Sequence, residues 1–298
     1  MTIGYIGLGK MGSAMVQRLL EKGHAVVATD PNESARATVK KEGATTVAAA
    51  ADVIAQLEIP RTVWIMVPHA VVDQVLDEIT PLLSVGDTVI DGGNSPYTES
   101  MRRGEDLGKK DIHFLDIGVS GGPCGARTGA CMMAGGDKEV YDRYEPLLAD
   151  LCVENGFGYM GKTGTGHFVK MVHNGIEYGM MQAIAEGFAV MKEKDFNLDL
   201  ENVAHVYGHG SVITSRLVSW LHNAYKEEGR DLDAISGEVS HSGEGLWTVE
   251  AAKELGVDVK IIEESLKFRE ASQGNPSYTG KVVSALRNQF GGHSVKKK

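Results

Sequence analysis

Five polar side chains recur at helical spacing in residues 166–178, which read GHFVKMVHNGIEY. The set consists of Lys170, His173, Asn174, Glu177 and Tyr178. Spacings of three, four, seven and eight residues from the lysine bring all five to one face of an α-helix. Such a face offers a base, imidazole and amide donors, a carboxylic acid and a phenol. A solvated polar face with a Lys–Glu pair is the simpler alternative, but such a face rarely combines His, Asn and Tyr.

A glycine-rich turn near the start of the chain predicts a dinucleotide site. Residues 7–12 read GLGKMG, follow the apolar residues 3–6 and precede a segment with helical apolar spacing. A Gly-x-Gly-x-x-Gly string has this meaning between a strand and a helix. Gly7 permits the tight turn, Gly9 lets a pyrophosphate approach the backbone, and Gly12 lets the helix pack against the strand. The helix N-terminus offers N–H groups to the phosphates.

Asp30 indicates which dinucleotide binds. It follows a second apolar strand, eighteen positions after Gly12. An acid here can accept both ribose hydroxyls of NAD, and it repels the extra phosphate of NADP. Two charges about 4 Å apart interact by roughly 4 kcal/mol at an effective dielectric constant of about 20, and half of that favours NAD more than tenfold. Arg36 can soften the repulsion, so we expect a preference for NAD, with NADP weaker. The residues assigned to the cofactor are Gly7, Leu8, Gly9, Lys10, Met11, Gly12, Asp30, Val67, Pro68, His69 and Asn94.

Composition excludes several classes of protein. The chain has 298 residues, of which 42% are hydrophobic and 23% charged, as expected for a globular protein of two domains. A formal net charge of −10 argues against nucleic-acid binding. An acidic protein that binds an anionic substrate must therefore gather its cations locally. No apolar run is long enough to span a bilayer, and Met1 and Thr2 lead straight into a core strand, so we expect a cytoplasmic protein that binds no membrane.

The three cysteines suggest neither a metal site nor a disulfide framework. Cys124, Cys131 and Cys152 have no zinc-site spacing, and no metal is expected. Cys131 and Cys152 are interpreted as small core residues.

The elements that must position these residues alternate between strand and helix in the first half of the chain. Continuous apolar strands are typical of a parallel sheet covered on both faces, which predicts a doubly wound α/β domain of Rossmann type. Gly-rich loops at 91–95 and 118–122 are expected to line the ligand crevice at the carboxyl ends of the strands. The strands are expected at residues 24–29, 63–67, 88–91, 114–117 and 130–134.

The character of the chain changes after the Gly-rich segment 161–166, beyond which strand-like alternation almost disappears. We therefore predict a dinucleotide-binding Rossmann domain at residues 1–163 and an all-α substrate and oligomerisation domain at residues 164–298. Helices are expected at about 167–194, 200–207, 215–226, 245–255, 259–270 and 278–289.

Residues 169–179, VKMVHNGIEYG, resemble the signature of decarboxylating 6-phosphogluconate dehydrogenases. The resemblance covers nearly the whole chain and includes the C-terminal residues 287–293, RNQFGGH. The length of the chain resembles that of the family's short form, which lacks the duplicated helical half of the long enzymes. The glycine-rich turn, the Ser120 loop and Lys170 are shared with the wider β-hydroxyacid dehydrogenases, whereas the rest of the helical face and the C-terminal motif are more specific.

The resemblance implies oxidative decarboxylation of 6-phosphogluconate to ribulose 5-phosphate and CO2 with reduction of NAD, a step of the pentose phosphate pathway. In the family, the residue matching Lys170 accepts the proton of the 3-hydroxyl as hydride leaves C3 for the nicotinamide. Partial burial can lower the pKa of a lysine toward the working pH. The ammonium then polarises the 3-keto group while CO2 leaves, and no metal is required. The residue matching Glu177 protonates C1 of the enediol.

The resemblance also implies a substrate site. Tyr178 and Arg287 would bind the phosphate, and His293 would bind a sugar hydroxyl. In the family, the residues matching Arg287 and His293 come from the partner subunit's C-terminal segment. This implies a dimer or tetramer with shared sites. In isolation, Arg287 could equally be a surface cation and His293 part of a frayed tail. The carboxylate and hydroxyls would be held by Asn94, Ser120, Gly121, Gly122, His173 and Asn174, with Asn94 also touching the nicotinamide ribose.

Two positions depart from the family pattern. The long enzymes carry a Lys and a Thr for the phosphate just before a Trp-Thr pair, where this chain has Ser242 and Glu244. An anionic Glu244 cannot contact phosphate without cost. In the second departure, Asp30 replaces a polar and basic triplet of NADP-using members. The remaining phosphate-binding candidates are Tyr178, Arg269, Lys281 and Arg287.

Two other functions remain open from the sequence. A β-hydroxyacid dehydrogenase for a small unphosphorylated acid would need Lys170 and Ser120 but no phosphate site. A non-catalytic NAD-binding sensor would keep the glycine-rich turn and Asp30 without an organised helical face.

Overall fold

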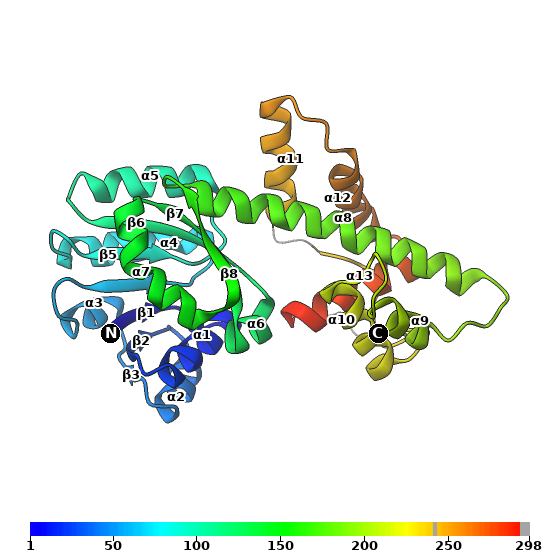
Figure 1. The fold of residues 1–298 in the computed structure, drawn as a ribbon, viewed down its shortest axis with the longest axis horizontal. Helices are drawn as coiled ribbons and strands as arrows, with labels where there is room; N and C mark the ends of the chain where they lie inside the picture. Colours follow the sequence, from blue (N-terminus) through cyan, green and yellow to red (C-terminus); the bar gives the residue numbers. More distant parts are fainter. Residues whose placement is uncertain (241–242, 293–298) are drawn as a thin grey trace. The chain divides into compact units, whose positions relative to one another are not determined.

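The chain folds into two compact units, Met1–Met171 and Val172–Lys298, in a computed structural model that describes residues 1–240 and 243–292. The first unit combines a sheet with helices, and the second consists of helices (Figure 1). The division falls inside the long helix α8, Thr165–Glu193. The domain boundary at 163/164 stays a proposal, which rests on the start of α8 immediately after it.

The first unit is built on an eight-stranded sheet, within the described residues, in the order β3-β2-β1-β4-β5-β6-β7-β8. Neighbouring strands are parallel except for β6 and β7, which pair antiparallel. The order reverses between β1 and β4, and open α/β sheets bind ligands at such a point. The strands are β1 Thr2–Ile6, β2 Ala25–Thr29, β3 Thr45–Thr46, β4 Thr62–Ile65, β5 Thr88–Asp91, β6 His113–Ser120, β7 Ala130–Gly136 and β8 Cys152–Gly161.

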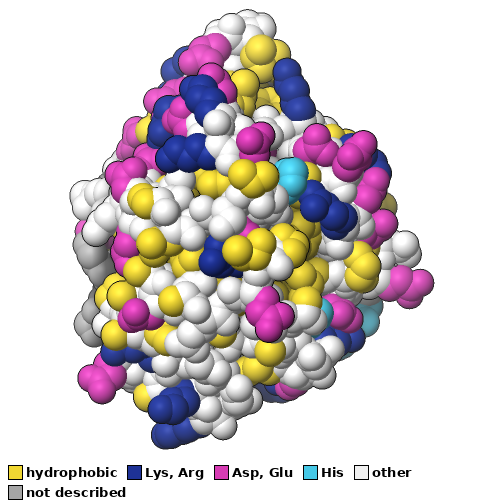
Figure 2. Space-filling view, turned by 90° about the vertical axis from the view of Figure 1, so that its left-hand side faces the viewer, with side chains coloured by type: hydrophobic (Ala, Val, Ile, Leu, Met, Phe, Trp, Pro, Cys, Tyr) yellow, Lys and Arg dark blue, Asp and Glu magenta, His cyan; other side chains and the backbone are white. Residues whose placement is uncertain are grey.

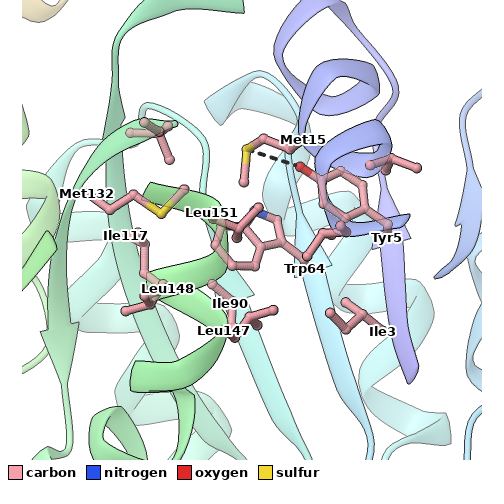
Figure 3. Close-up of a cluster of buried hydrophobic side chains, with 14 of the residues drawn as sticks. Ile3, Tyr5, Met15, Trp64, Ile90, Ile117, Met132, Leu147, Leu148 and Leu151 are labelled. Atoms are coloured by element: carbon pink, nitrogen blue, oxygen red, sulfur yellow. Dashed lines mark hydrogen bonds between the residues drawn. The ribbon is translucent and has the colours of Figure 1, made fainter. Parts of the chain in front are cut away.

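Helices cover both faces of this sheet because successive strand residues point to opposite sides and both sides are apolar. In β4, Trp64 belongs to the core cluster that contains residues of α1 and α7, whereas Ile65 belongs to the cluster that contains residues of α3, α4 and α5. Figure 3 shows the first cluster, where Tyr5 donates a hydrogen bond to Met15 Sδ at 3.5 Å. The helices of this unit are α1 Lys10–Glu21, α2 Glu33–Lys41, α3 Ala50–Ala55, α4 His69–Ile79, the 3₁₀ turn η1 Thr80–Leu82, α5 Tyr97–Gly108, α6 Gly122–Thr128 and α7 Lys138–Leu151.

The predicted Rossmann-type domain is confirmed, but the expected loop at 118–122 is wrong in part. Gly118 and Ser120 belong to β6, because they pair with Met133 and Cys131 of β7. The antiparallel direction of β7 also differs from the parallel sheet expected. Strand β8 was not predicted, because it is an edge strand whose residues are mostly exposed or half-buried and therefore lack an apolar run.

The two cysteines expected in the core have different environments. Cys152 is buried, as expected, whereas Cys131 is exposed. Cys131 is the one exposed residue of β7, since the other residues of this strand are all buried.

The second unit is all-helical within its described residues, which confirms the expected class. Its core cluster includes Met181 and Phe188 from α8, Leu221 from α10 and Leu286 from α13. The expected bounds agree with the observed ones to within two residues at each end. After α8, the helices are α9 Leu200–Tyr207, α10 Arg216–Glu228, α11 Glu244–Leu255, α12 Lys260–Ser272 and α13 Tyr278–Gly291.

Two surface properties bear on function. None of the helices in residues 1–240 and 243–292 has the length and apolar character that a membrane span requires. On the face drawn in Figure 2, acidic and basic side chains of the described residues are intermixed, without a continuous basic area.

Candidate functional site

The glycines of the β1–α1 turn have distinct roles. Gly7 has a φ of +102°, and a Cβ on it would overlap the carbonyl oxygen of Met66. A Cβ on Gly12 would overlap the carbonyl oxygen of Gly7. A Cβ on Gly9 would meet nothing within 4 Å, although Gly9 is the N-cap residue of α1. The packing of the chain therefore requires Gly7 and Gly12, while Gly9 leaves open backbone at a helix N-terminus, where anions bind.

The loops after β4 and β5 lie beside this turn. A Cβ on Gly7 would come within 2.8 Å of Val67 Cγ1, and a Cβ on Gly93 within 2.8 Å of the Val67 carbonyl oxygen. Val67 therefore lies between the glycine-rich turn and the loop that carries Asn94. Pro68, which follows Val67, is the N-cap residue of α4, and His69 is the first residue of that helix. The predicted cofactor residues thus converge at the carboxyl edge of the sheet.

The Asp30 carboxylate is joined to the same turn. Its Oδ2 accepts the Leu8 N–H at 2.6 Å, and its Oδ1 accepts the Asn32 N–H at 2.8 Å. Arg36 donates to the carbonyl oxygen of Asp30. Since each carboxylate oxygen has two lone pairs, acceptor positions remain for ribose hydroxyls.

A buried ion pair supports the loop around Asn94. Asp91 is fully buried and accepts hydrogen bonds from Gly93 N–H at 3.1 Å and Ser95 Oγ–H at 2.8 Å. Arg103, itself 3% exposed, lies 3.5 Å from Asp91 and donates to Ser95 Oγ at 3.1 Å. This buried network holds the loop after β5 in place, while Asn94 itself is exposed. Arg103 was not predicted from the sequence, because it lies among other charged residues of α5.

Lys170 lies directly on strand β6. A Cβ on Gly118 would overlap Lys170 Cβ, and a Cβ on Gly166 would overlap the Asp116 carbonyl oxygen. Glycines therefore allow the first turns of α8 to approach the sheet closely. Lys170 is buried as a result. Ser120 lies two residues after Gly118 and hence on the same face of β6.

Asp116 holds the start of α8 from this strand. Its Oδ1 accepts the Gly164 N–H at 2.7 Å and its Oδ2 accepts the His167 N–H at 2.8 Å. Burial raises the pKa of Asp116, against the lowering effects of His167 and the N–H donors. The His167 ring is buried, and its Nδ1 lies 2.7 Å from Ser100 Oγ. Asp116 was not predicted as a site residue, although a lone acid inside an apolar strand is the sequence feature that could have indicated it.

The predicted polar face continues along α8 in the second unit. His173 Nδ1 lies 3.0 Å from Asn174 Oδ1 and 3.9 Å from Glu177 Oε2. Asn174 and Tyr178 are buried, and Glu177 is half-buried. The helix expected over this face is confirmed, whereas the roles of its residues remain predictions.

Two buried arginines lie at the end of this face. Arg269 Cζ is 3.4 Å from the ring centroid of Tyr178, and the side chain is 1% exposed. Among the described residues, its Nη1 and Nη2 have no hydrogen-bond acceptor. Burial lowers the pKa of Arg269 to about 10, and the positive charge of Arg287 adds to the lowering. Burial also lowers the pKa of Arg287, which donates to Ser240 Oγ at 2.9 Å. A buried guanidinium group with donors left over, such as that of Arg269, is suited to binding an anion.

Arg287 lies near Tyr178 of its own chain, and its expected contribution to a partner subunit's site stays a prediction. The two residues interact electrostatically. The reason is that α13 is part of the core of its own unit, where Val283 and Leu286 share a buried cluster with Tyr178.

Lys281 is not part of this group, since its Nζ donates to Asp231 O at 2.9 Å and to Asp233 Oδ1 at 3.1 Å. It is therefore a poor phosphate candidate. Ser242 and His293 lie outside the described residues.

Family comparisons cover both units. Residues 2–161 match the family described as the NAD binding domain of 6-phosphogluconate dehydrogenase, and residues 166–289 match the C-terminal domain of 6-phosphogluconate dehydrogenase. The chain belongs to the 6-phosphogluconate dehydrogenase family. It is thus an oxidoreductase, and the family predicted from the sequence is confirmed.

Similar proteins include full-length relatives and a longer solved structure. A Bacillus subtilis (strain 168) protein, YqeC, provisionally named a 6-phosphogluconate dehydrogenase, is 49% identical over all of both chains. A Haloferax volcanii protein named NAD(+)-dependent decarboxylating 6-phosphogluconate dehydrogenase is 41% identical over 100% of this chain and 99% of that one. The solved Plasmodium falciparum 6-phosphogluconate dehydrogenase is 31% identical with a TM-score of 0.83, covering 91% of this chain and 62% of that chain. The chain therefore spans about three fifths of that longer enzyme.

Proposed function

We propose that this protein oxidatively decarboxylates 6-phosphogluconate to ribulose 5-phosphate and CO2, with NAD as the hydride acceptor. The observation that carries the proposal is the pair of buried arginines near Tyr178, where Nη1 and Nη2 of Arg269 have no hydrogen-bond acceptor within residues 1–240 and 243–292. An unphosphorylated hydroxy acid would offer no phosphate oxygens to these donors, whereas a phosphate oxygen can accept charge-assisted hydrogen bonds from a guanidinium group.

NAD fits the residues at the carboxyl edge of the sheet. The open backbone at Gly9 would face the pyrophosphate, and the Asp30 carboxylate would accept the ribose hydroxyls. Val67, Pro68, His69 and Asn94 would line the nicotinamide half. The bound cofactor would supply a hydride acceptor.

Lys170 is the proposed general base. Its neutral amine would take the proton of the 3-hydroxyl as the C3 hydride leaves. The resulting ammonium would then stabilise the negative charge at the C3 oxygen while the C1 carboxylate departs as CO2. Close packing of the lysine stem on Gly118 would restrict where its Nζ can reach.

Glu177 is the proposed acid that protonates C1 of the enediol. It lies seven residues beyond Lys170, about two turns along α8. His173, 3.9 Å from the Glu177 carboxylate, can orient that group.

The substrate would be held at its two ends. Arg269, Arg287 and Tyr178 would bind the phosphate, the first of these replacing the Lys and Thr that this chain lacks. The carboxylate and hydroxyls would be held by Asn94, Ser120, Gly121, Gly122, His173 and Asn174, with His293 from a neighbouring subunit.

Self-association as a dimer or tetramer is also proposed. Ile176 and Met180 on α8 are 53% and 42% exposed, and Ile261 on α12 is 72% exposed. A Cβ on Gly179 would lie 3.3 Å from Ile261 Cγ2, so these helices present adjacent apolar side chains. A second copy would remove this area from water.

The reaction can be tested by incubating the protein with 6-phosphogluconate and NAD while NADH and CO2 are quantified together. Equal yields are expected, with gluconate as the matched substrate lacking phosphate and reacting poorly. NADH without CO2 would indicate a simple hydroxyacid dehydrogenase. Cofactor binding without turnover on any hydroxy acid would indicate an NAD sensor.

Cofactor preference can be measured as the ratio of kcat/KM for NAD and NADP. The Asp30 carboxylate should favour NAD more than tenfold, by charge repulsion of the NADP phosphate. Equal values for the two cofactors would refute this role of Asp30.

A further inference from the structure

Glu244 is a buried acid beside the two arginines. It is the first residue of α11 and is 5% exposed, whereas the first-turn acids Glu33 of α2 and Glu139 of α7 are exposed. An interaction with the helix dipole does not require burial. The position of Glu244 therefore needs a different explanation.

Tyr178 connects Glu244 with the arginines. A Cβ on Gly245, the residue after Glu244, would overlap the Tyr178 ring, and the Arg269 guanidinium also contacts that ring. The Glu244 charge acts on Arg269 and on Arg287.

The charges of this group balance without any ligand. Arg269 and Arg287 supply two positive charges, while Glu177 and Glu244, which both act on them, supply two negative charges. Addition of a phosphate dianion makes the group net negative. Glu177 belongs to the proposed catalytic machinery, which leaves Glu244 as the carboxylate whose presence must be explained.

We infer that Glu244 is the resident counter-ion of Arg269 and Arg287 and a determinant of affinity, which competes with phosphate for their guanidinium groups. This inference rests on the proposed function, because it concerns the phosphate end of that substrate. Without ligand, the carboxylate stabilises two buried cations. With ligand, it repels the phosphate, so binding is weaker and release of a phosphorylated product is faster.

The structure also explains why phosphate can still bind. Nη1 and Nη2 of Arg269 have no acceptor among the described residues, so donors remain for phosphate oxygens while Glu244 is present. Charge-assisted hydrogen bonds of this kind are strong in buried surroundings. Glu244 thus lowers the affinity of the site without abolishing binding.

The inference can be tested with inorganic phosphate as the probe. Titration calorimetry would compare the full-length wild type with Glu244→Gln, which removes the charge but keeps the shape. Phosphate should bind Glu244→Gln about tenfold more tightly. Glu244→Asp keeps the charge, and Glu250→Gln removes an exposed charge from the same helix. Both controls should bind phosphate as the wild type does.

Kinetics and thermal unfolding give independent readouts. The KM for 6-phosphogluconate should fall about tenfold in Glu244→Gln, while kcat does not rise. Without phosphate, Glu244→Gln should melt below the wild type, because the two arginines lose their counter-ion. Phosphate should then raise its Tm more than that of the wild type.

Unchanged or weaker phosphate binding by Glu244→Gln would overturn the inference. Absence of phosphate binding in both proteins would also overturn it, together with the phosphate site. Activity of the wild type on 6-phosphogluconate is measured separately, so failure of the inference is distinguishable from failure of the proposed reaction.

Discussion

Lys170 shows how backbone contacts can set the position of a reactive side chain. Its stem lies on the bare backbone of Gly118, where any other residue would overlap it. The placement therefore depends on a missing side chain in β6 as much as on α8.

Replacement of Lys170 by Met should lower kcat by about 10²–10⁴-fold, because the volume is kept while the proposed base is lost. NAD affinity should not change, since Lys170 is not among the cofactor residues. Steady-state kinetics and a fluorescence titration with NAD would measure both. Lys162→Met, at an exposed lysine shortly before α8, is the matched control and should retain activity. A Lys170→Met enzyme with full kcat would exclude the lysine as the base.

Substitutions of two glycines in the β1–α1 turn should affect different properties of the protein, one its stability and the other its affinity for NAD. Gly9→Ala should leave the free energy of unfolding nearly unchanged, because Gly9 has a φ of −63° and open space around it, but should weaken NAD binding. Gly12→Ala should cost about 1–3 kcal/mol of stability, because its Cβ would overlap the Gly7 carbonyl oxygen. Urea unfolding and NAD titration of both variants would measure this contrast. Equal stability losses would show that the chain itself requires Gly9.

At the scale of elements, α8 joins the proposed base to the proposed acid, and Asp116 of β6 determines where that helix begins. The carboxylate accepts two backbone N–H groups that would otherwise be buried without a partner. A cap supplied by a strand fixes the helix to the sheet and also accepts hydrogen bonds from backbone N–H groups at the start of the helix.

Asp116→Asn should reduce stability by about 1–3 kcal/mol, because an amide presents N–H groups to N–H donors. It should also lower kcat, since the start of α8 positions Lys170. Asp137→Asn is the matched control, because Asp137 caps α7 through Glu139 and Val140. The control should leave kcat unchanged, and both variants can be compared by denaturation and kinetics. If Asp116→Asn lost stability at full kcat, its role would be limited to folding.

Asp73 couples α4 to α5 and should make stability depend on pH. Hydrogen bonds from Arg103 and Arg102 lower the pKa of Asp73 to about 2. Because the folded-state pKa is depressed, this contribution is present above the ordinary aspartate range and is lost as the pH falls through about 2. The stability difference between the wild type and Asp73→Asn should therefore be largest near neutral pH and vanish in acid. Denaturation at several pH values would measure it, with Asp77→Asn on the same helix as control. A pH-independent difference would contradict the coupling.

For the whole molecule, the main consequence of the fold concerns self-association. Arg287 lies near Tyr178 of its own chain, so this interaction gives no evidence of a neighbouring subunit. The apolar side chains exposed on α8 and α12 remain the reason to expect one.

Sedimentation velocity of the wild type should show a dimer or tetramer. Ile261→Glu should shift the protein toward monomer, because a charge would be placed in the apolar contact. Val85→Glu, at a similarly exposed residue of the first unit, should not change the assembly. A fully active wild-type monomer would exclude the proposed shared site.

The sequence by itself determined the repeating and local features of this protein. Continuous apolar strands predicted the doubly wound sheet, and apolar spacing predicted the helices of the second unit to within two residues. The glycine-rich turn and the motif around Lys170 identified the family, because close backbone approaches and reacting groups tolerate few residue types.

Tertiary structure alone decided the contacts between distant segments. The antiparallel direction of β7, the capping of α8 by Asp116 and the burial of Arg269 against Tyr178 join residues far apart in the chain. Periodicity reports which face of an element is apolar, but not which element covers it. The grouping of Glu244 with Arg269 and Arg287 arises for the same reason, since a charge in the sequence has no partner until packing gives it one.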